Sequence, residues 1–187
     1  MSEARPVRAD AVRNRRRILK AAREQIGSQG SAAGMDDIAQ AAGVAVGTLY
    51  RHFPTKADLV SAVIAEHVRE IADDAEGSLA RARSGVRAVD EIGSFLKRAA
   101  GAIAHNHAVK VAAESLGVDD PAEHTDEARG AAAVAELIRL GQRAGDVRDG
   151  VTVADIYLLM ATAPTDQPDA VQQRWLQLVL PGIATRT

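Results

Sequence analysis

Side chains of the types that bind phosphate cluster in one short stretch, from residue 46 to residue 56. Hydroxyl, guanidinium, imidazole and ammonium groups all donate hydrogen bonds to phosphate oxygens. A glycine in the same stretch would let the backbone come close to a partner, and a valine can meet the methyl group of a thymine. The candidate DNA-contacting residues here are Val46, Gly47, Thr48, Tyr50, Arg51, His52 and Lys56.

Two short helical patterns would hold these side chains in place. In the first, residues 35–42, the apolar residues are spaced three, one and three positions apart and share one helical face. Gly43 follows, and glycine takes the left-handed conformation that ends a helix without a Cβ penalty. The second helix is predicted over about 46–52; it buries Leu49 and ends before Pro54, which lacks an N–H. Two helices joined by a short turn containing glycine predict a helix-turn-helix, whose second helix enters the DNA major groove.

The residues that flank this motif add positive charge. Thr55 and Asp58 form a variant of the capping box, so a further helix is expected to begin here with Lys56 at its first position. Upstream, residues 10–28 predict a helix with an apolar stripe and a crowd of arginines in its first half. These arginines would meet phosphate or form an ordinary solvated face; the candidate contacts among them are Arg13 and Arg16.

The first nine residues are polar and contain a proline and two arginines. We expect residues 1–9 to be a flexible arm. Such an arm either has no role or follows the DNA backbone or minor groove.

The stretch AAGVAVGTLYRHFPTKADL resembles the DNA-binding signature of the TetR family of bacterial transcriptional regulators. The resemblance covers roughly residues 10–60, and the later segment ELIRLGQRAGDVRDGVTVADI is similar to one that is common in these regulators. Gly34 departs from the pattern, since the family often has Thr or Ser at this helix cap, and Asp36 cannot replace a basic residue that reads a base. Base reading is therefore expected to depend on the second helix of the motif. The phosphate contacts that the resemblance implies are Thr48, Tyr50, His52 and Lys56.

Composition and charge agree with a two-part protein. The 187 residues are 47% hydrophobic but only 3% aromatic, so Ala, Val, Leu and Ile must build the core. Residues 1–60 hold ten Lys or Arg against six Asp or Glu (+4), and residues 61–187 hold thirteen against nineteen (−6). A basic end on an acidic body is the asymmetry expected when one end meets phosphate. The chain has no cysteine, no long apolar run and no apolar signal segment, so we expect no membrane association and a cytoplasmic protein.

No alternating β pattern occurs, so we expect an all-α fold. A three-helix helix-turn-helix DNA-binding domain is predicted over residues 1–55, with the motif at 35–53. A larger helical bundle for regulation, ligand binding and dimerisation is predicted over residues 56–187. Its predicted helices span residues 56 to about 80, 87–105, 108–117, 122–144, 152–161 and 169–181, with a break at the His-Asn-His triplet 105–107 and an end at Pro181-Gly182.

The bundle offers a mostly apolar pocket and an apolar interface. A small, mostly apolar effector would suit such a pocket, and its candidate lining residues are His67, Phe95, Arg98, His105, His107 and Glu114. No cofactor or metal is expected, because histidines two positions apart do not share a helical face and no cysteine completes a site. A two-fold homodimer is expected to form through the last two long helices; the candidate interface residues are Leu158, Val171, Trp175, Leu178 and Val179.

These patterns predict a DNA-binding transcriptional regulator, most simply a repressor that a small-molecule effector releases from a near-palindromic operator in double-stranded DNA. One alternative is a DNA-binding regulator controlled by a partner protein without a small ligand. The other is a small helical enzyme, against which stands the lack of a nucleophile elbow, P-loop, metal set or carboxylate pair. We therefore predict no enzymatic activity.

Overall fold

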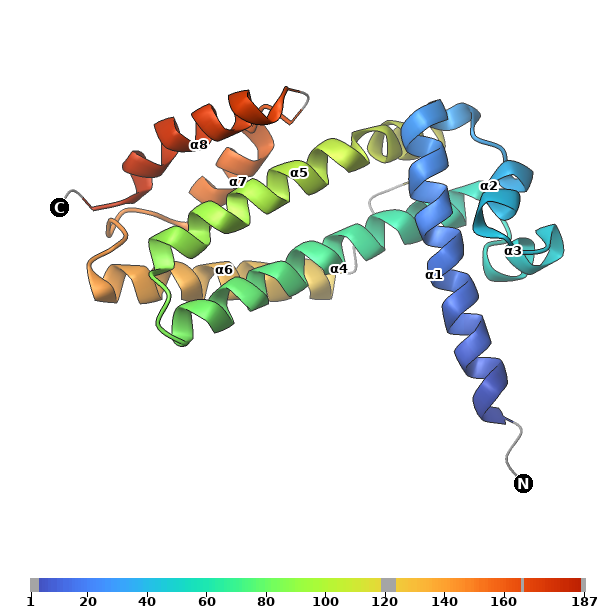
Figure 1. The fold of residues 1–187 in the computed structure, drawn as a ribbon, viewed down its shortest axis with the longest axis horizontal. Coiled ribbons are helices and arrows are strands. Elements are labelled where there is room, and N and C mark those ends of the chain that lie inside the picture. Colours follow the sequence, from blue (N-terminus) through green and yellow to red (C-terminus); the bar gives the residue numbers. More distant parts are fainter. Residues whose placement is uncertain (1–3, 119–123, 166, 186–187) are drawn as a thin grey trace. The chain divides into compact units, whose positions relative to one another are not determined.

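The computed structural model describes residues 4–118, 124–165 and 167–185, apart from the side chains of residues 4–8, 103–105, 107 and 124. The all-α prediction is confirmed: among these residues the only β pairing is an isolated bridge between Val147 and Ala184. No helix among them combines the length and the apolar character that a membrane span needs. The elements are α1 (Ala4–Gln29), η1 (Gly30–Ala32), α2 (Met35–Ala42), α3 (Val46–His52), α4 (Lys56–Arg83), α5 (Ala88–Ser115), α6 (His124–Ala144), α7 (Val153–Thr162) and α8 (Asp169–Ile183) (Figure 1).

The helix-turn-helix forms as its local signals predict. Helix α2 ends at Gly43, which has a left-handed φ of 61°, and α3 begins three residues later. Thr55 and Asp58 form the reciprocal capping box at the start of α4. The Thr55 N–H donates to the Asp58 carboxylate at 3.0 Å, and the Asp58 N–H donates to the Thr55 hydroxyl at 3.1 Å. Two short-range features therefore set the end of α2 and the start of α4.

Helix α1 begins earlier than expected. Residues 4–9 are helical, so the prediction of an arm over residues 1–9 is wrong for this part, and residues 1–3 lie outside the described residues. Pro6 is compatible with this start because it lies in the first turn of α1, where backbone N–H groups have no helical partner. Val12 lies in the helix 10–28 for which an apolar stripe was predicted, but it is 54% exposed.

Two helices continue past residues that were expected to break them. Helix α5 runs through the His-Asn-His triplet, since its alanine-rich flanks favour helix and residues 102–115 contain no Gly or Pro. Helix α8 runs past Pro181 to Ile183. Arg148 stabilises that end: its guanidinium donates to the carbonyls of Pro181 at 3.1 Å and Ala184 at 2.8 Å.

The chain divides into two compact units. The first, which we call the motif unit, is Met1–Glu66 with His105–Ala122; the second, the body unit, is His67–Ala104 with Glu123–Thr187. Helices α4 and α5 each contribute residues to both units, so the domain boundary predicted between residues 55 and 56 stays a prediction. The core of the motif unit includes the α5 residues Val109, Ala112 and Ala113 beside residues of α1 to α4.

Small residues allow close helix packing in the body unit. A Cβ at Gly130 of α6 would lie 3.3 Å from the Cα of Ala72 in α4, and a Cβ at Gly93 of α5 would lie 3.0 Å from Leu180 of α8. The α4 to α6 contact also carries an ion-pair cluster, in which Arg129 pairs with Asp73 at 2.8 Å and with Glu76 at 3.0 Å. These contacts hold α4, α5 and α6 at the positions that shape the cavity described below.

Candidate functional site

Helix α3 buries one side and leaves the other open. Leu49 is fully buried in the core of the motif unit, whereas Val46 is 41% and Tyr50 44% exposed. Exposed large apolar and aromatic side chains on a short helix are available to a partner. Of the other predicted contact residues on this helix, Gly47 and Arg51 are exposed and Thr48 and His52 are half-buried.

The packing of the described residues does not explain why position 47 holds a glycine. A Cβ placed on it would have no heavy atom of the described residues within 4 Å, and its φ lies outside the left-handed range. A helical glycine costs roughly 1 kcal/mol relative to alanine. The open space above Gly47 therefore suits a partner whose surface approaches the α3 backbone closely.

The four clustered arginines of α1, residues 13 and 15–17, divide into two groups. Arg17 donates a 2.7 Å hydrogen bond to the Gly43 carbonyl, and Arg15 lies 4.8 Å from the ring centre of Phe53. These two side chains tie α1 to the turn and to the end of α3. Arg13 pairs with Asp10, and Arg16 is exposed.

Lys56 connects the start of α4 to the loop before α2. Its ammonium donates 2.6 Å hydrogen bonds to the carbonyl oxygens of Ser31 and Ala33. An ammonium has three donors, so one N–H remains for a further acceptor. The side chain is half-buried and its charge lies close to the N-terminus of α4.

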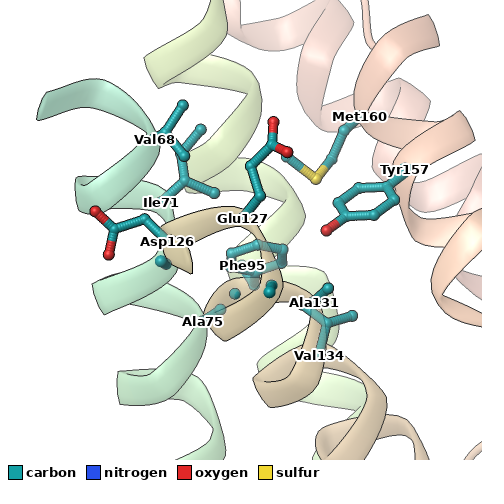
Figure 2. A pocket seen from close by; sticks show the side chains of 13 residues that line it. Val68, Ile71, Ala75, Phe95, Asp126, Glu127, Ala131, Val134, Tyr157 and Met160 are labelled. Carbon is teal, nitrogen blue, oxygen red and sulfur yellow. The ribbon is translucent and has the colours of Figure 1, made fainter. Parts of the chain in front are cut away.

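The body unit contains a cavity of about 630 Å³. Helices α4, α5, α6 and α7 all contribute to it, and Figure 2 shows their side chains around one space. Most of the lining is apolar, and the polar lining groups are the carboxylates of Asp126 and Glu127 and the hydroxyl of Tyr157. The lining residues are Val68, Ile71, Ala72, Ala75, Phe95, Asp126, Glu127, Ala128, Gly130, Ala131, Val134, Tyr157 and Met160.

Comparison with known proteins assigns both parts of the chain. Residues 18–63 match the model of the bacterial regulatory proteins of the tetR family. Residues 87–185, more than half of the chain, match the model of the SbtR-like transcriptional regulator C-terminal domain. The chain belongs to the TetR family of bacterial transcriptional regulators.

Solved structures agree with this assignment. The TetR transcription regulatory protein from Mycobacterium vanbaalenii is 35% identical, with a TM-score of 0.80, over 96% of this chain and 100% of the other. The TetR transcriptional regulator SCO0520 from Streptomyces coelicolor is 26% identical, with a TM-score of 0.74, over 92% of this chain and 99% of the other. No curated protein matches the chain.

As a TetR-family transcriptional regulator, the protein has a DNA-binding helix-turn-helix, and α3 is its second helix. The roles predicted for individual residues stay predictions. The structure adds that Lys56 and Arg13 already have partners within the chain. It also distinguishes Arg16 from its neighbour Arg17, because only Arg17 bonds to the motif turn.

Of the residues predicted to line the pocket, only Phe95 is among the described lining residues of the cavity. Phe95 lines the cavity, whereas His67 is not among the lining residues, although its neighbours Val68 and Ile71 are. Glu114 is exposed near the end of α5, in the motif unit. The side chains predicted at His105 and His107 lie outside the described residues.

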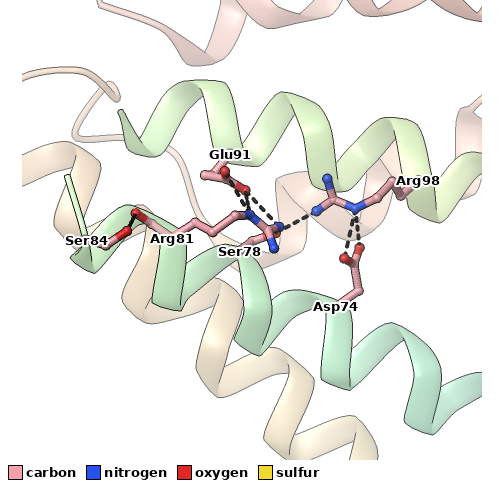
Figure 3. Close-up of polar contacts among 6 residues, drawn as sticks. All are labelled: Asp74, Ser78, Arg81, Ser84, Glu91 and Arg98. Atoms are coloured by element: carbon pink, nitrogen blue, oxygen red, sulfur yellow. Dashed lines mark hydrogen bonds and ion pairs between the residues drawn. The ribbon is translucent and has the colours of Figure 1, made fainter. Parts of the chain in front are cut away.

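Arg98, also predicted for the pocket, belongs to a polar network between α4 and α5 (Figure 3). It donates to Asp74 at 2.8 Å and to the Ser78 hydroxyl at 2.8 Å. Arg81 also donates to Ser78, at 3.1 Å, and to both carboxylate oxygens of the buried Glu91, each at 3.0 Å. The network pairs two guanidiniums with two carboxylates and holds the helices together, so Arg98 is committed to helix packing.

Sequence reasoning missed the polar residues of the cavity. Asp126 and Glu127 lie in the first turn of α6, in a segment read as a polar loop and helix start. Tyr157 and Met160 are three positions apart on α7, and that spacing puts them on one face. This spacing was a usable signal, whereas nothing local indicated that α6 and α7 line one cavity together with α4.

The predicted interface residues lie on a partly exposed apolar surface of α7 and α8. Leu158 and Leu178 are 61% and 63% exposed, and Val171 is also exposed. Trp175 and Val179 are half-buried. An apolar surface of this kind on two neighbouring sequence elements fits contact with another chain.

Proposed function

We propose that the protein is a repressor that binds a near-palindromic operator as a homodimer and leaves it when a small molecule occupies the body cavity. DNA binding is supported by the open outer face of α3. In the described residues nothing fills the space beside Gly47, whereas Leu49 on the other face is fully buried. A major-groove helix needs such a face, since base edges must come close to its backbone. DNA as the partner supports a cytoplasmic location.

In this proposal Thr48, Tyr50, His52 and Lys56 contact phosphates, and Val46 and Gly47 face base edges. Arg51 serves either role. Arg13 and Arg16 add phosphate contacts from α1. Phosphate contacts position the helix and base contacts specify the site, so these groups of residues affect binding differently.

The homodimer would form through α7 and α8. The exposed Leu158, Val171 and Leu178 support this, because monomeric proteins rarely expose large contiguous apolar patches to water. A two-fold dimer presents two copies of α3, and half-sites about 34–36 Å apart fit one turn of DNA. The operator would then share the two-fold symmetry of the protein.

The cavity supports control by a small molecule rather than by a partner protein. Its volume of about 630 Å³ lies within the range of ligand pockets. Helix α4 lines it with four residues and begins directly after the motif, so a ligand that favours one position of α4 also favours one position of the motif. Linkage then requires that DNA and effector weaken each other's binding by the same factor.

Mapping the binding sites of the protein on its own genome tests the DNA part. We expect near-palindromic sites, and fluorescence anisotropy with those duplexes should give affinities that fall steeply with salt. Sites without two-fold symmetry would contradict the dimeric reading. If a purified partner protein, but no small molecule, released the DNA, control through the cavity would be wrong.

A further inference from the structure

The charged groups that line the body cavity all have one sign. Asp126 and Glu127 are its charged lining residues, and none of the lining residues in the described part of the chain is basic. The remaining lining is apolar except for Tyr157. A ligand in this cavity therefore meets hydrocarbon over most of its surface and negative charge at one place.

The two carboxylates differ in what already binds them. Asp126 accepts hydrogen bonds from Arg129 at 3.0 and 3.2 Å, and Arg69 lies 3.4 Å from its other oxygen. Its charge is thus compensated from within the body unit. For Glu127 no ion pair occurs within the described residues, and its side chain is exposed.

The charge of Glu127 acts on the cavity itself. The pKa of the Tyr157 hydroxyl is raised, first by burial and then by the negative charge of Glu127. Tyr157 belongs to the same lining, so the potential of the carboxylate reaches the space that a ligand would fill. The position of Glu127 in the first turn of α6 also stabilises that helix, but the helix end offsets only part of the charge of Glu127.

Aromatic rings complete the lining. Phe95, which is 2% exposed, and Tyr157 both border the space, and Figure 2 shows them beneath and beside Glu127. Aromatic faces attract cations that have lost part of their hydration shell. Met160 adds a polarisable sulfur.

From these observations we infer that the effector of this cavity is an organic cation: an amine or quaternary ammonium group, held by Glu127 and the ring of Tyr157, on an apolar body that fills the space between α4, α5 and α6. The inference rests on the proposed function, in which this cavity is the effector site. An organic anion is disfavoured because it would meet the carboxylate of Glu127 and no basic residue of the lining. A neutral ligand would leave the carboxylate of Glu127 without a partner.

The test is calorimetric titration of the full-length protein with three probes that share a phenyl ring on a six-carbon chain: phenylhexyl-trimethylammonium, phenylhexanol and phenylhexanoate. We expect the cation to bind most tightly and the carboxylate least. Glu127→Gln should weaken binding of the cation about tenfold, as expected for loss of a partly desolvated charge contact. Its affinity for phenylhexanol should stay unchanged.

Asp149→Asn is the matched control, because it makes the same chemical change at an exposed residue outside the cavity. It should leave all three affinities unchanged. Thermal unfolding and anisotropy with operator DNA verify that each variant is folded and still binds DNA. Met160→Trp should weaken binding of the cation and of the alcohol by the same factor, because the larger side chain fills the cavity without changing its charge.

Three results would overturn the inference: no binding of the cation, equal or tighter binding of the alcohol or the carboxylate, or equal loss of cation affinity in Glu127→Gln and Asp149→Asn. Each of these leaves the DNA-binding proposal intact, because operator binding is measured without any probe. If the unmodified protein failed to bind operator DNA, the proposed function would be wrong. The ranking of the three probes would then still show whether the cavity prefers a cation.

Discussion

The guanidinium of Arg17 donates a 2.7 Å hydrogen bond to the carbonyl oxygen of Gly43, the residue that separates the two helices of the motif. The bond joins α1 to the turn between α2 and α3. Arg16, its neighbour in the sequence, is likewise exposed but makes no hydrogen bond to this turn within the described residues. Adjacent residues on a helix point in directions about 100° apart. Arg17 therefore reaches the turn of the motif, whereas Arg16 points elsewhere and can contact a partner.

The pair Arg16 and Arg17 gives the first prediction. Arg17→Ala should lower the free energy of unfolding by about 1 kcal/mol, because it removes a charged donor from a partly exposed hydrogen bond. Arg16→Ala should leave the stability within about 0.5 kcal/mol and lower the salt slope of DNA binding by about 1. Chemical denaturation and anisotropy at several salt concentrations measure both. Identical behaviour of the two variants would contradict the assignment.

Gly47 gives a prediction in which stability and DNA binding move in opposite directions. Gly47→Ala should stabilise the free protein by about 0.5–1 kcal/mol, because alanine favours helix and the added methyl would meet no atom of the described residues outside the local α3 backbone. The same methyl should weaken operator binding if the α3 backbone lies against the DNA. Gly27→Ala is the control: this α1 glycine is equally open, and its substitution should not change DNA affinity.

Lys56 should act both on the fold and on DNA. Lys56→Ala removes the donor to the Ser31 and Ala33 carbonyls, so the melting temperature should fall. Binding should weaken for all DNA sequences, with a salt slope lower by about 1. Lys20→Ala serves as the control, since that ammonium is well exposed on α1. An unchanged salt slope in Lys56→Ala would limit Lys56 to a structural role.

Leu49 tests the register of α3. Leu49→Ala should cost about 2–5 kcal/mol, because it leaves a cavity in the core of the motif unit. Val12→Ala should change stability by less than about 0.5 kcal/mol, as expected for a side chain that is 54% exposed. Thermal unfolding measures both variants. A fully stable Leu49→Ala protein that binds DNA would show that Leu49 does not face the core.

The α7 and α8 surface predicts the assembly. Leu158→Asp and Leu178→Asp place charges on side chains that are 61% and 63% exposed, so the monomer should fold normally while the dimer dissociates. Light scattering at micromolar concentration should give a dimer mass for the unmodified protein and a monomer mass for the variants. Val86→Asp, at an apolar residue 43% exposed outside α7 and α8, should stay dimeric. A monomer mass for the unmodified protein would rule out the interface.

Where the signal was local, the sequence determined the structure. The apolar spacing in residues 35–42, the left-handed Gly43, Pro54 and the pair Thr55 and Asp58 each act over a few residues, and the helices of the motif begin and end where they indicate. The resemblance to the TetR family lies in the same stretch, which one family model matches. The helix break predicted at residues 105–107 was wrong because the alanine-rich flanks, without Gly or Pro, favour a continuous helix.

The tertiary structure alone decided which side chains share a site. Phe95, Glu127 and Tyr157 line one cavity from three helices, and their separation in the chain carries no information about that meeting. It also decided that Arg98 joins Asp74 and Ser78 in a helix contact. A helical pattern tells which residues share a face, but the partner of that face depends on how the helices dock. Docking is set by side-chain volumes and charges summed over the whole interface.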